Sequence, residues 1–139
     1  MANILNFEDL KAWQKARELA SLVYSYTKKE AFSRDFGLKD QIQRAAGSIM
    51  HNLAEGFEAG TDLEKSRFFI FARRSASEVQ SELYLALDAK YISQVELKHG
   101  YDLAVEIKKM IFSLLNYLKR DKSVSELEGL YDPSSAVDS

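Results

Sequence analysis

The chain of 139 residues contains a single proline, Pro133, and only six glycines. Because proline and glycine are the main breakers of helical backbone, almost nothing before residue 133 interrupts a helix. Apolar residues make up 46% of the chain and charged residues 29%, a balance typical of folded globular domains. The sequence therefore predicts one all-α domain, since its length is close to that of an average domain.

Apolar residues recur at spacings of three and four in four segments, as they do on one face of a helix. The predicted helices cover about residues 7–29, 35–56, 62–90 and 94–119. The last two begin at capping-box sequences, Thr61 with Glu64 and Ser93 with Glu96, in which each side chain can bond to the other residue's backbone amide. Four amphipathic helices joined by short links predict an antiparallel up-down-up-down four-helix bundle.

Charge divides the chain into two parts. Residues 1–119, the predicted bundle, carry 17 basic and 16 acidic side chains, whereas residues 120–139 carry 2 and 5. The net charge of −2 therefore belongs to the C-terminal segment, which we expect to be an acidic, largely disordered tail. A short helical turn around residues 124–130 is compatible with its sequence, because Leu127, Leu130 and Tyr131 could dock on a neighbouring surface.

The middle of the second predicted helix is a run of small residues, Ala45, Ala46, Gly47 and Ser48. A glycine inside a helix costs about 1 kcal/mol relative to alanine. Small side chains also allow another helix to approach closely. We therefore expect a close helix crossing at Gly47 to compensate for its cost.

Several kinds of chemistry lack the residues that they require. There is no cysteine, so disulfides, thiolate metal sites and cysteine nucleophiles are excluded. A carboxylate-bridged metal centre in a bundle needs two Glu-x-x-His motifs, but the chain has one, Glu96 to His99, whose glutamate is already assigned to a cap. The pair His51 and Glu55 shares a helix face, as two zinc ligands could, although a solvated histidine is the simpler interpretation. The sequence thus predicts no enzyme, no metal and no cofactor.

No apolar run approaches the ~18 residues of a spanning helix. The first residues also lack the basic and apolar regions of a signal peptide. We expect a cytoplasmic protein without a membrane partner.

The third predicted helix has an unusual order of charges. Its basic residues come first and its acidic residues last: Lys65, Arg67, Arg73 and Arg74, then Glu78, Glu82 and Asp88. This order opposes the helix dipole, so helix stability does not explain it. Two functional interpretations remain open beside a plain solvated surface. The basic end could contact the acidic end of the next copy in a ring, or it could bind phosphates together with Lys39 and Arg44.

Apolar residues on the same helix cover more than one core-facing stripe, because Phe69, Phe71 and Leu85 extend beyond it. A second apolar surface favours contact with another copy of the chain. The candidate oligomer interface comprises Phe69, Phe71, Arg73, Glu78, Glu82 and Leu85.

Three segments resemble one known family. They are Phe7-Glu8-Asp9-Leu10, Gln41-Ile42-Gln43-Arg44-Ala45 and Asn52-Leu53-Ala54-Glu55-Gly56. Their order along about residues 6–118 is similar to that of the four-helix-bundle proteins encoded in intervening sequences of 23S ribosomal RNA genes. The resemblance implies a homo-oligomer, typically a pentameric ring, without known catalysis.

A related branch, the accessory variability determinants of diversity-generating retroelements, associates with a reverse transcriptase and with nucleic acid through a basic surface. By analogy, an RNA or partner contact here would involve Arg44 and the basic start of the third helix. One departure weakens this analogy: Glu58 and Asp62 lie where relatives often have a basic loop. The sequence therefore predicts a non-enzymatic homo-oligomeric scaffold with RNA or an RNA-associated protein as a candidate partner. The alternatives are an adaptor without nucleic-acid contact and, third, a metal-dependent bundle enzyme.

Overall fold

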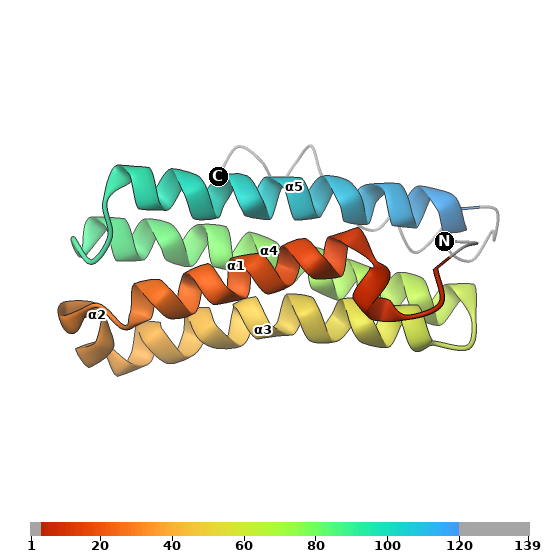
Figure 1. Ribbon diagram of the computed structural model, residues 1–139, viewed down its shortest axis with the longest axis horizontal. Coiled ribbons are helices and arrows are strands. Elements are labelled where there is room, and N and C mark those ends of the chain that lie inside the picture. The colour runs from red at the N-terminus through yellow and green to blue at the C-terminus, as the bar shows by residue number, and fades with distance from the viewer. Residues whose placement is uncertain (1–3, 120–139) are drawn as a thin grey trace.

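The computed structural model describes residues 4–119; the expected acidic tail, and so the boundary at residue 119, lies outside the described residues. Four long helices form the fold (Figure 1). They are α1 (Lys11–Thr27), α3 (Phe36–Glu58), α4 (Asp62–Asp88) and α5 (Gln94–Leu118). Two short elements complete the described part, a 3-10 turn η1 (Phe7–Asp9) and helix α2 (Glu30–Arg34). The predicted all-α fold with four long helices is confirmed.

Each long helix packs against two antiparallel neighbours. The helix α4 contacts α3 and α5, and α1 contacts the same two helices from the other side. Successive long helices run in opposite directions, so α4 begins at the end of the bundle where α3 and α5 finish (Figure 1). The first turns of α4 and the last turns of α5 therefore lie at the same end of the bundle.

The start of the first helix differs from the predicted boundary at residue 7. Leu10 has extended backbone, with φ −73° and ψ 118°, and separates η1 from α1. The edge of the Phe7 ring packs on Trp13, with 5.2 Å between the ring centroids. That contact turns the chain onto the bundle before the helix begins.

The core consists of the apolar side chains whose spacing of three and four residues predicted the helices. Fully buried residues come from all four long helices: Leu19, Val23, Ile42, Ile49, Leu53, Val79, Leu83, Ile107, Ile111 and Leu115. Burial of such a side chain stabilises the fold by about 1.5 to 3 kcal/mol. The hydrophobic effect along these stripes therefore sets how the helices face one another.

The close crossings in the bundle occur at Gly56 and Gly100. A Cβ atom added at Gly56 would lie 2.6 Å from Cε1 of Phe69, and one added at Gly100 would lie 2.9 Å from Cδ1 of Leu83. The run of small residues does pack against α4, because Ala45 and Ala46 are buried and the Ser48 hydroxyl lies 2.8 Å from that of Ser75, but Gly47 itself is not at the crossing. A Cβ atom there would meet only the His51 side chain, at 3.9 Å, because this position faces outward. Its cost in helix stability is not compensated within the protomer.

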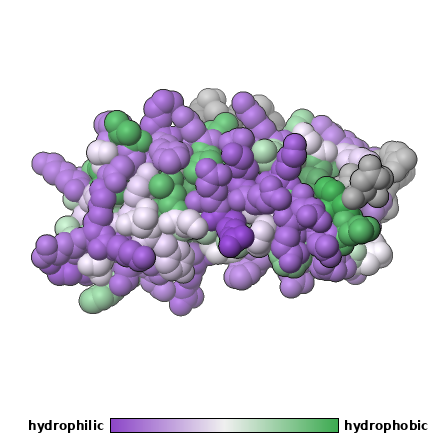
Figure 2. Space-filling view, viewed as in Figure 1, coloured by the Kyte–Doolittle hydropathy of each residue, from purple (hydrophilic) through white to green (hydrophobic). Residues whose placement is uncertain are grey.

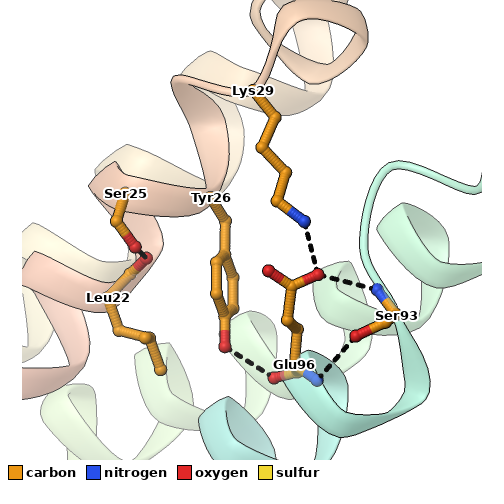
Figure 3. Close-up of polar contacts among 6 residues, drawn as sticks. All are labelled: Leu22, Ser25, Tyr26, Lys29, Ser93 and Glu96. Carbon is orange, nitrogen blue, oxygen red and sulfur yellow. Dashed lines mark hydrogen bonds and ion pairs between the residues drawn. The ribbon is translucent and has the colours of Figure 1, made fainter.

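The start of α5 is fixed by a group of polar contacts with α1 (Figure 3). Ser93 forms the predicted capping box, because its hydroxyl accepts from the Glu96 N–H at 3.2 Å and Glu96 Oε1 accepts from the Ser93 N–H at 2.9 Å. The Lys29 ammonium pairs with the same carboxylate, and the Tyr26 hydroxyl donates to the Glu96 carbonyl at 2.8 Å. At the other predicted box, the Thr61 hydroxyl accepts from the Glu64 N–H at 3.1 Å, which caps the first turn of α4.

These contacts also set the charge state of Glu96. Burial alone would raise its pKa, but the hydrogen bonds from Lys29 and Ser93 and the positive charge of Lys29 outweigh burial and lower the pKa. The glutamate of the one Glu-x-x-His motif therefore holds two helices together.

Candidate functional site

The structure does not gather the six predicted cations into one basic surface. Lys65 reaches across the turn to the end of α3, where its ammonium donates to the Phe57 carbonyl at 2.7 Å. A cation at this place satisfies carbonyl groups that the end of a helix leaves without partners. The structural role of Lys65 thus accounts for its position.

Arg73 is 2% exposed and lies two helical turns before Gln80, which contacts Lys108 of α5. The pKa of Lys108 on α5 is lowered, mainly by burial and secondly by the positive charge of Arg73. A guanidinium at this depth is not on the surface that a phosphate backbone or a second copy would reach. Arg73 and Arg74 therefore serve different surfaces although they are adjacent in sequence.

The two cations predicted on the second helix are separate from those on α4. Arg44 is exposed on α3 and forms an ion pair with Asp40 at 3.0 Å between Nε and Oδ2. Lys39 lies one turn earlier, with its ammonium 5.2 Å from the centroid of the Phe36 ring. An acid beside Arg44 reduces the attraction of this surface for phosphate.

The exposed side of α4 carries a stripe of charged and apolar side chains, which we call the outer face of α4. Its residues recur every three, four or seven positions and are exposed: Arg67, Phe71, Arg74, Glu78 and Leu85. Phe71 is 47% exposed and Leu85 is 54% exposed. The Arg74 guanidinium lies 5.9 Å from the centroid of the Phe71 ring. Apolar and charged side chains alternate here as in many protein interfaces.

Three residues of the predicted oligomer interface belong to the protomer's own interior. Phe69 is fully buried against Gly56, and Glu82 is 3% exposed. Together with the buried Arg73, they leave Phe71, Glu78 and Leu85 as the predicted interface residues on the surface. The cause is that α4 packs against two helices, so its buried arc is wider than one apolar stripe.

Glu82 is an unusual buried acid. Neither of its carboxylate oxygens has a hydrogen-bond partner among the described residues. Burial and then the negative charge of Glu78, one turn earlier, raise the pKa of Glu82 to about 7. The carboxyl therefore keeps its proton to a higher pH than an exposed glutamate does.

A shallow hollow of about 410 Å³ lies over Gly47 on the outward side of α3. Gly47 is one of its lining residues, and the nearest contact of a Cβ atom added there would be the His51 side chain, at 3.9 Å. The surrounding residues come from α1 and α3: Tyr24, Asp40, Gln43, Arg44, Ser48 and His51. In the view of Figure 2 the molecular surface is mainly hydrophilic, with hydrophobic residues in separate patches.

A polar stripe along one side of α4, which contacts Lys108 of α5 through Gln80, was not predicted from the sequence. It comprises Ser66, Arg73, Ser77 and Gln80 of α4 with Lys108 of α5, and we call it the polar seam. The Lys108 ammonium donates to Gln80 Oε1 at 3.1 Å. Ser66, Arg73 and Gln80 are spaced by seven residues, so this spacing was the available signal.

Candidate metal ligands lie apart in the part of the chain that the structure describes. No three histidine, aspartate or glutamate side chains come together there as ligands could. The pair His51 and Glu55 and the lone His99 are exposed. None of the helices within residues 4–119 is long and apolar enough to cross a bilayer.

The fold and surface define a small antiparallel helical bundle in which α4 has an exposed face of charged and apolar side chains. The sequence profile of the 23S rRNA-intervening sequence protein family matches residues 8–113, and the chain belongs to this family. A comparison with curated proteins finds no match. A crystal structure of a protein of unknown function from the S23 ribosomal protein family of Bacteroides thetaiotaomicron has a similar fold, with a TM-score of 0.68 and 24% identity. The alignment covers 74% of this chain and 93% of that chain. Neither match names an enzymatic activity.

Proposed function

We propose that this protein is a non-enzymatic scaffold that assembles from several copies of itself, five being the number that the resemblance implies. The observation that carries the proposal is the outer face of α4, where Phe71 and Leu85 are about half exposed between charged side chains. Contact of apolar side chains with water is unfavourable, so their burial against a partner surface is favourable.

The receiving surface in this proposal is the hollow over Gly47. A glycine in the middle of α3 costs about 1 kcal/mol, and its own protomer supplies no contact that requires it. A phenyl ring from a second copy fits a hollow that any larger side chain at position 47 would fill. Phe71 of one copy in the hollow of the next is a heterologous contact, which closes into a ring when its rotation allows.

Charge supports the same pairing. The outer face of α4 presents Arg67 and Arg74, and the outward side of α3 presents the exposed acids Asp40, Glu55 and Glu58. Opposite charges across an interface steer association and fix its register.

The proposal predicts that one substitution in either of the two surfaces prevents assembly. Phe71→Ser removes the inserted side chain, and Gly47→Leu fills the hollow without harming α3, because leucine is a better helix former than glycine. We expect each variant to remain a single chain in sedimentation velocity. A 1:1 mixture should yield a two-chain particle, since the mixture retains one intact Phe71 and one intact hollow.

The matched control is Phe112→Ser on α5, because Phe112 is 43% exposed and lies outside the outer face of α4. This variant should retain the wild-type mass. Wild-type mass in both Phe71→Ser and Gly47→Leu would reject the proposed contact.

A second candidate function is binding of single-stranded RNA. It is favoured by the exposed Arg67 and Arg74, which lie on the same stripe as the Phe71 ring. Arginine and an aromatic ring together can contact a phosphate backbone and stack on bases.

This second function predicts that Arg67→Gln with Arg74→Gln weakens RNA binding at least about tenfold, because counterion release is lost at each neutralised contact. Gel-shift titration with a single-stranded RNA at two salt concentrations measures the effect. Arg44→Gln is the matched control, since Arg44 is also exposed but pairs with Asp40. Equal weakening by all cation variants would indicate a general charge effect without an RNA site.

A further inference from the structure

Glu82 lies at the border between the outer face of α4 and the side of α4 that packs against α3. Ser75, seven residues earlier and so on the same side of the helix, meets Ser48 of α3, with 2.8 Å between the two hydroxyl oxygens. Glu78 and Leu85 of the outer face lie one turn before and one turn after Glu82. The carboxyl is therefore adjacent both to the α3–α4 contact and to the surface that the proposed assembly covers.

The Glu82 side chain is buried without a partner. It is 3% exposed, and neither carboxylate oxygen has a hydrogen bond within residues 4–119. A buried carboxylic acid is tolerated more easily as a neutral group than as an anion, because an anion must be hydrated or paired. An ionised Glu82 therefore requires water at the carboxylate or a side chain that turns toward water.

The charge that acts on Glu82 comes from α4 itself. The serine contact sets the register of the antiparallel helices α3 and α4, so the uncharged Gln41 of α3 lies opposite Glu82, each seven residues from that contact. At the same level α5 meets α4 on another side, where Gly100 packs against Leu83. Within the described residues, the charge of Glu78 adds to burial in raising the pKa of Glu82.

The outer face of α4 is the route by which an ionised Glu82 can reach water, because Glu78 and Leu85 beside it are exposed. The proposed assembly covers this face with another copy and excludes water from the same place. Covering the face also lowers the dielectric around the Glu78 carboxylate, so repulsion between the two carboxylates becomes stronger. Contact between copies and ionisation of Glu82 therefore oppose each other.

We propose that Glu82 is a proton switch for self-assembly: a copy whose outer face of α4 is covered holds Glu82 as a neutral acid, and loss of that proton releases the contact. The switch rests on the proposed self-assembly and adds its regulation. Because association takes up a proton, the dissociation constant of the contact rises with pH. Each pH unit above the pKa of Glu82, about 7 in the separate chain, adds up to about tenfold.

The two complementary variants of the proposed contact isolate one contact for measurement. The Gly47→Leu chain keeps Phe71 and the Phe71→Ser chain keeps its hollow, so their mixture forms a particle of two chains. In this particle the outer face of α4 is covered in the Gly47→Leu chain and open to water in the Phe71→Ser chain. Sedimentation velocity of the mixture from pH 6 to pH 8.5 gives the dissociation constant, which should rise at least about threefold.

Placement of Glu82→Gln in one chain or the other gives a matched pair of mixtures. In the Gly47→Leu chain, whose outer face is covered, this substitution should make the dissociation constant independent of pH. In the Phe71→Ser chain, whose outer face is open, it should leave the rise unchanged. The comparison separates the switch from a general effect on stability, because the same substitution is made in both mixtures.

Three results would overturn the switch. Equal dissociation constants at pH 6 and pH 8.5 would do so while leaving the proposed contact in place. A rise that persists with Glu82→Gln in the Gly47→Leu chain would assign the pH dependence to another group, and His51 in the hollow would be the first to test. Absence of a two-chain particle at every pH would reject the contact itself, and the switch with it.

Discussion

Gly56→Ala is expected to lower the free energy of unfolding by about 2 to 3 kcal/mol, within the range for an overpacked core. The added Cβ would lie 2.6 and 2.7 Å from two atoms of the Phe69 ring and 3.1 Å from the Phe68 Cβ. Phe69 is fully buried, so its ring cannot move aside without disturbing the core. Helices α3 and α4 must therefore separate. Urea denaturation followed by circular dichroism measures the loss.

Gly47→Ala on the same helix is the matched control, and its expected effect has the opposite sign. The new methyl group meets only the His51 side chain at 3.9 Å, so the gain in helix propensity of about 0.5 to 1 kcal/mol is retained. Both glycine variants should be compared in the Phe71→Ser background, where the proposed assembly does not contribute. Destabilisation by Gly47→Ala in that background would show that position 47 is packed within the protomer.

Glu82→Gln is expected to stabilise the protein at pH 8 by about 1 to 3 kcal/mol and to have almost no effect at pH 4. Burial and then the charge of Glu78 raise the pKa of Glu82 to about 7 from an ordinary value of 4.5. Between pH 4.5 and about 7, the Glu82 carboxyl has released its proton in the unfolded chain but keeps it in the folded chain. The free energy of unfolding of the wild type therefore falls as pH rises from 4.5 to about 7. A pKa that is one unit higher in the folded chain than in the unfolded chain corresponds to about 1.4 kcal/mol.

The neutral amide of glutamine removes this dependence while nearly preserving the shape of the side chain. Glu78→Gln is the control, because it removes the neighbouring charge but leaves the buried carboxyl, so it should recover only part of the gain. Denaturation curves at several pH values compare the three proteins. Equal stabilisation by Glu82→Gln at pH 4 and pH 8 would mean that ionisation of Glu82 has no role.

The long helices could be predicted because their signals are local. Apolar periodicity and the Ser93 cap depend on residues within a few positions of one another, and the structure confirms both. The position of the close crossing was also present in the sequence. Gly56 lies seven residues after Ile49, which lies seven after Ile42, so all three share the buried stripe. Gly47 lies off that stripe and faces solvent.

The candidate site was harder to predict because it depends on which flank of α4 faces each neighbour. Arg73 and Arg74 differ by about 100° around the helix, and only the packing of α5 shows which of them is buried. The role of Lys65 depends on the carbonyl groups at the end of another helix, which no pattern within α4 reveals. Glu82 was similarly predicted to lie in an oligomer interface, but the packing of α4 places it in the interior of the protomer.

The measurement that tests the proposed scaffold most directly is the mass of the wild-type particle by sedimentation velocity over a range of micromolar concentrations. Assembly through the outer face of α4 predicts a discrete multiple of the 15.8 kDa chain. It also predicts that Phe71→Ser alone returns the particle to one chain. A wild-type particle of 15.8 kDa at every concentration would contradict the account.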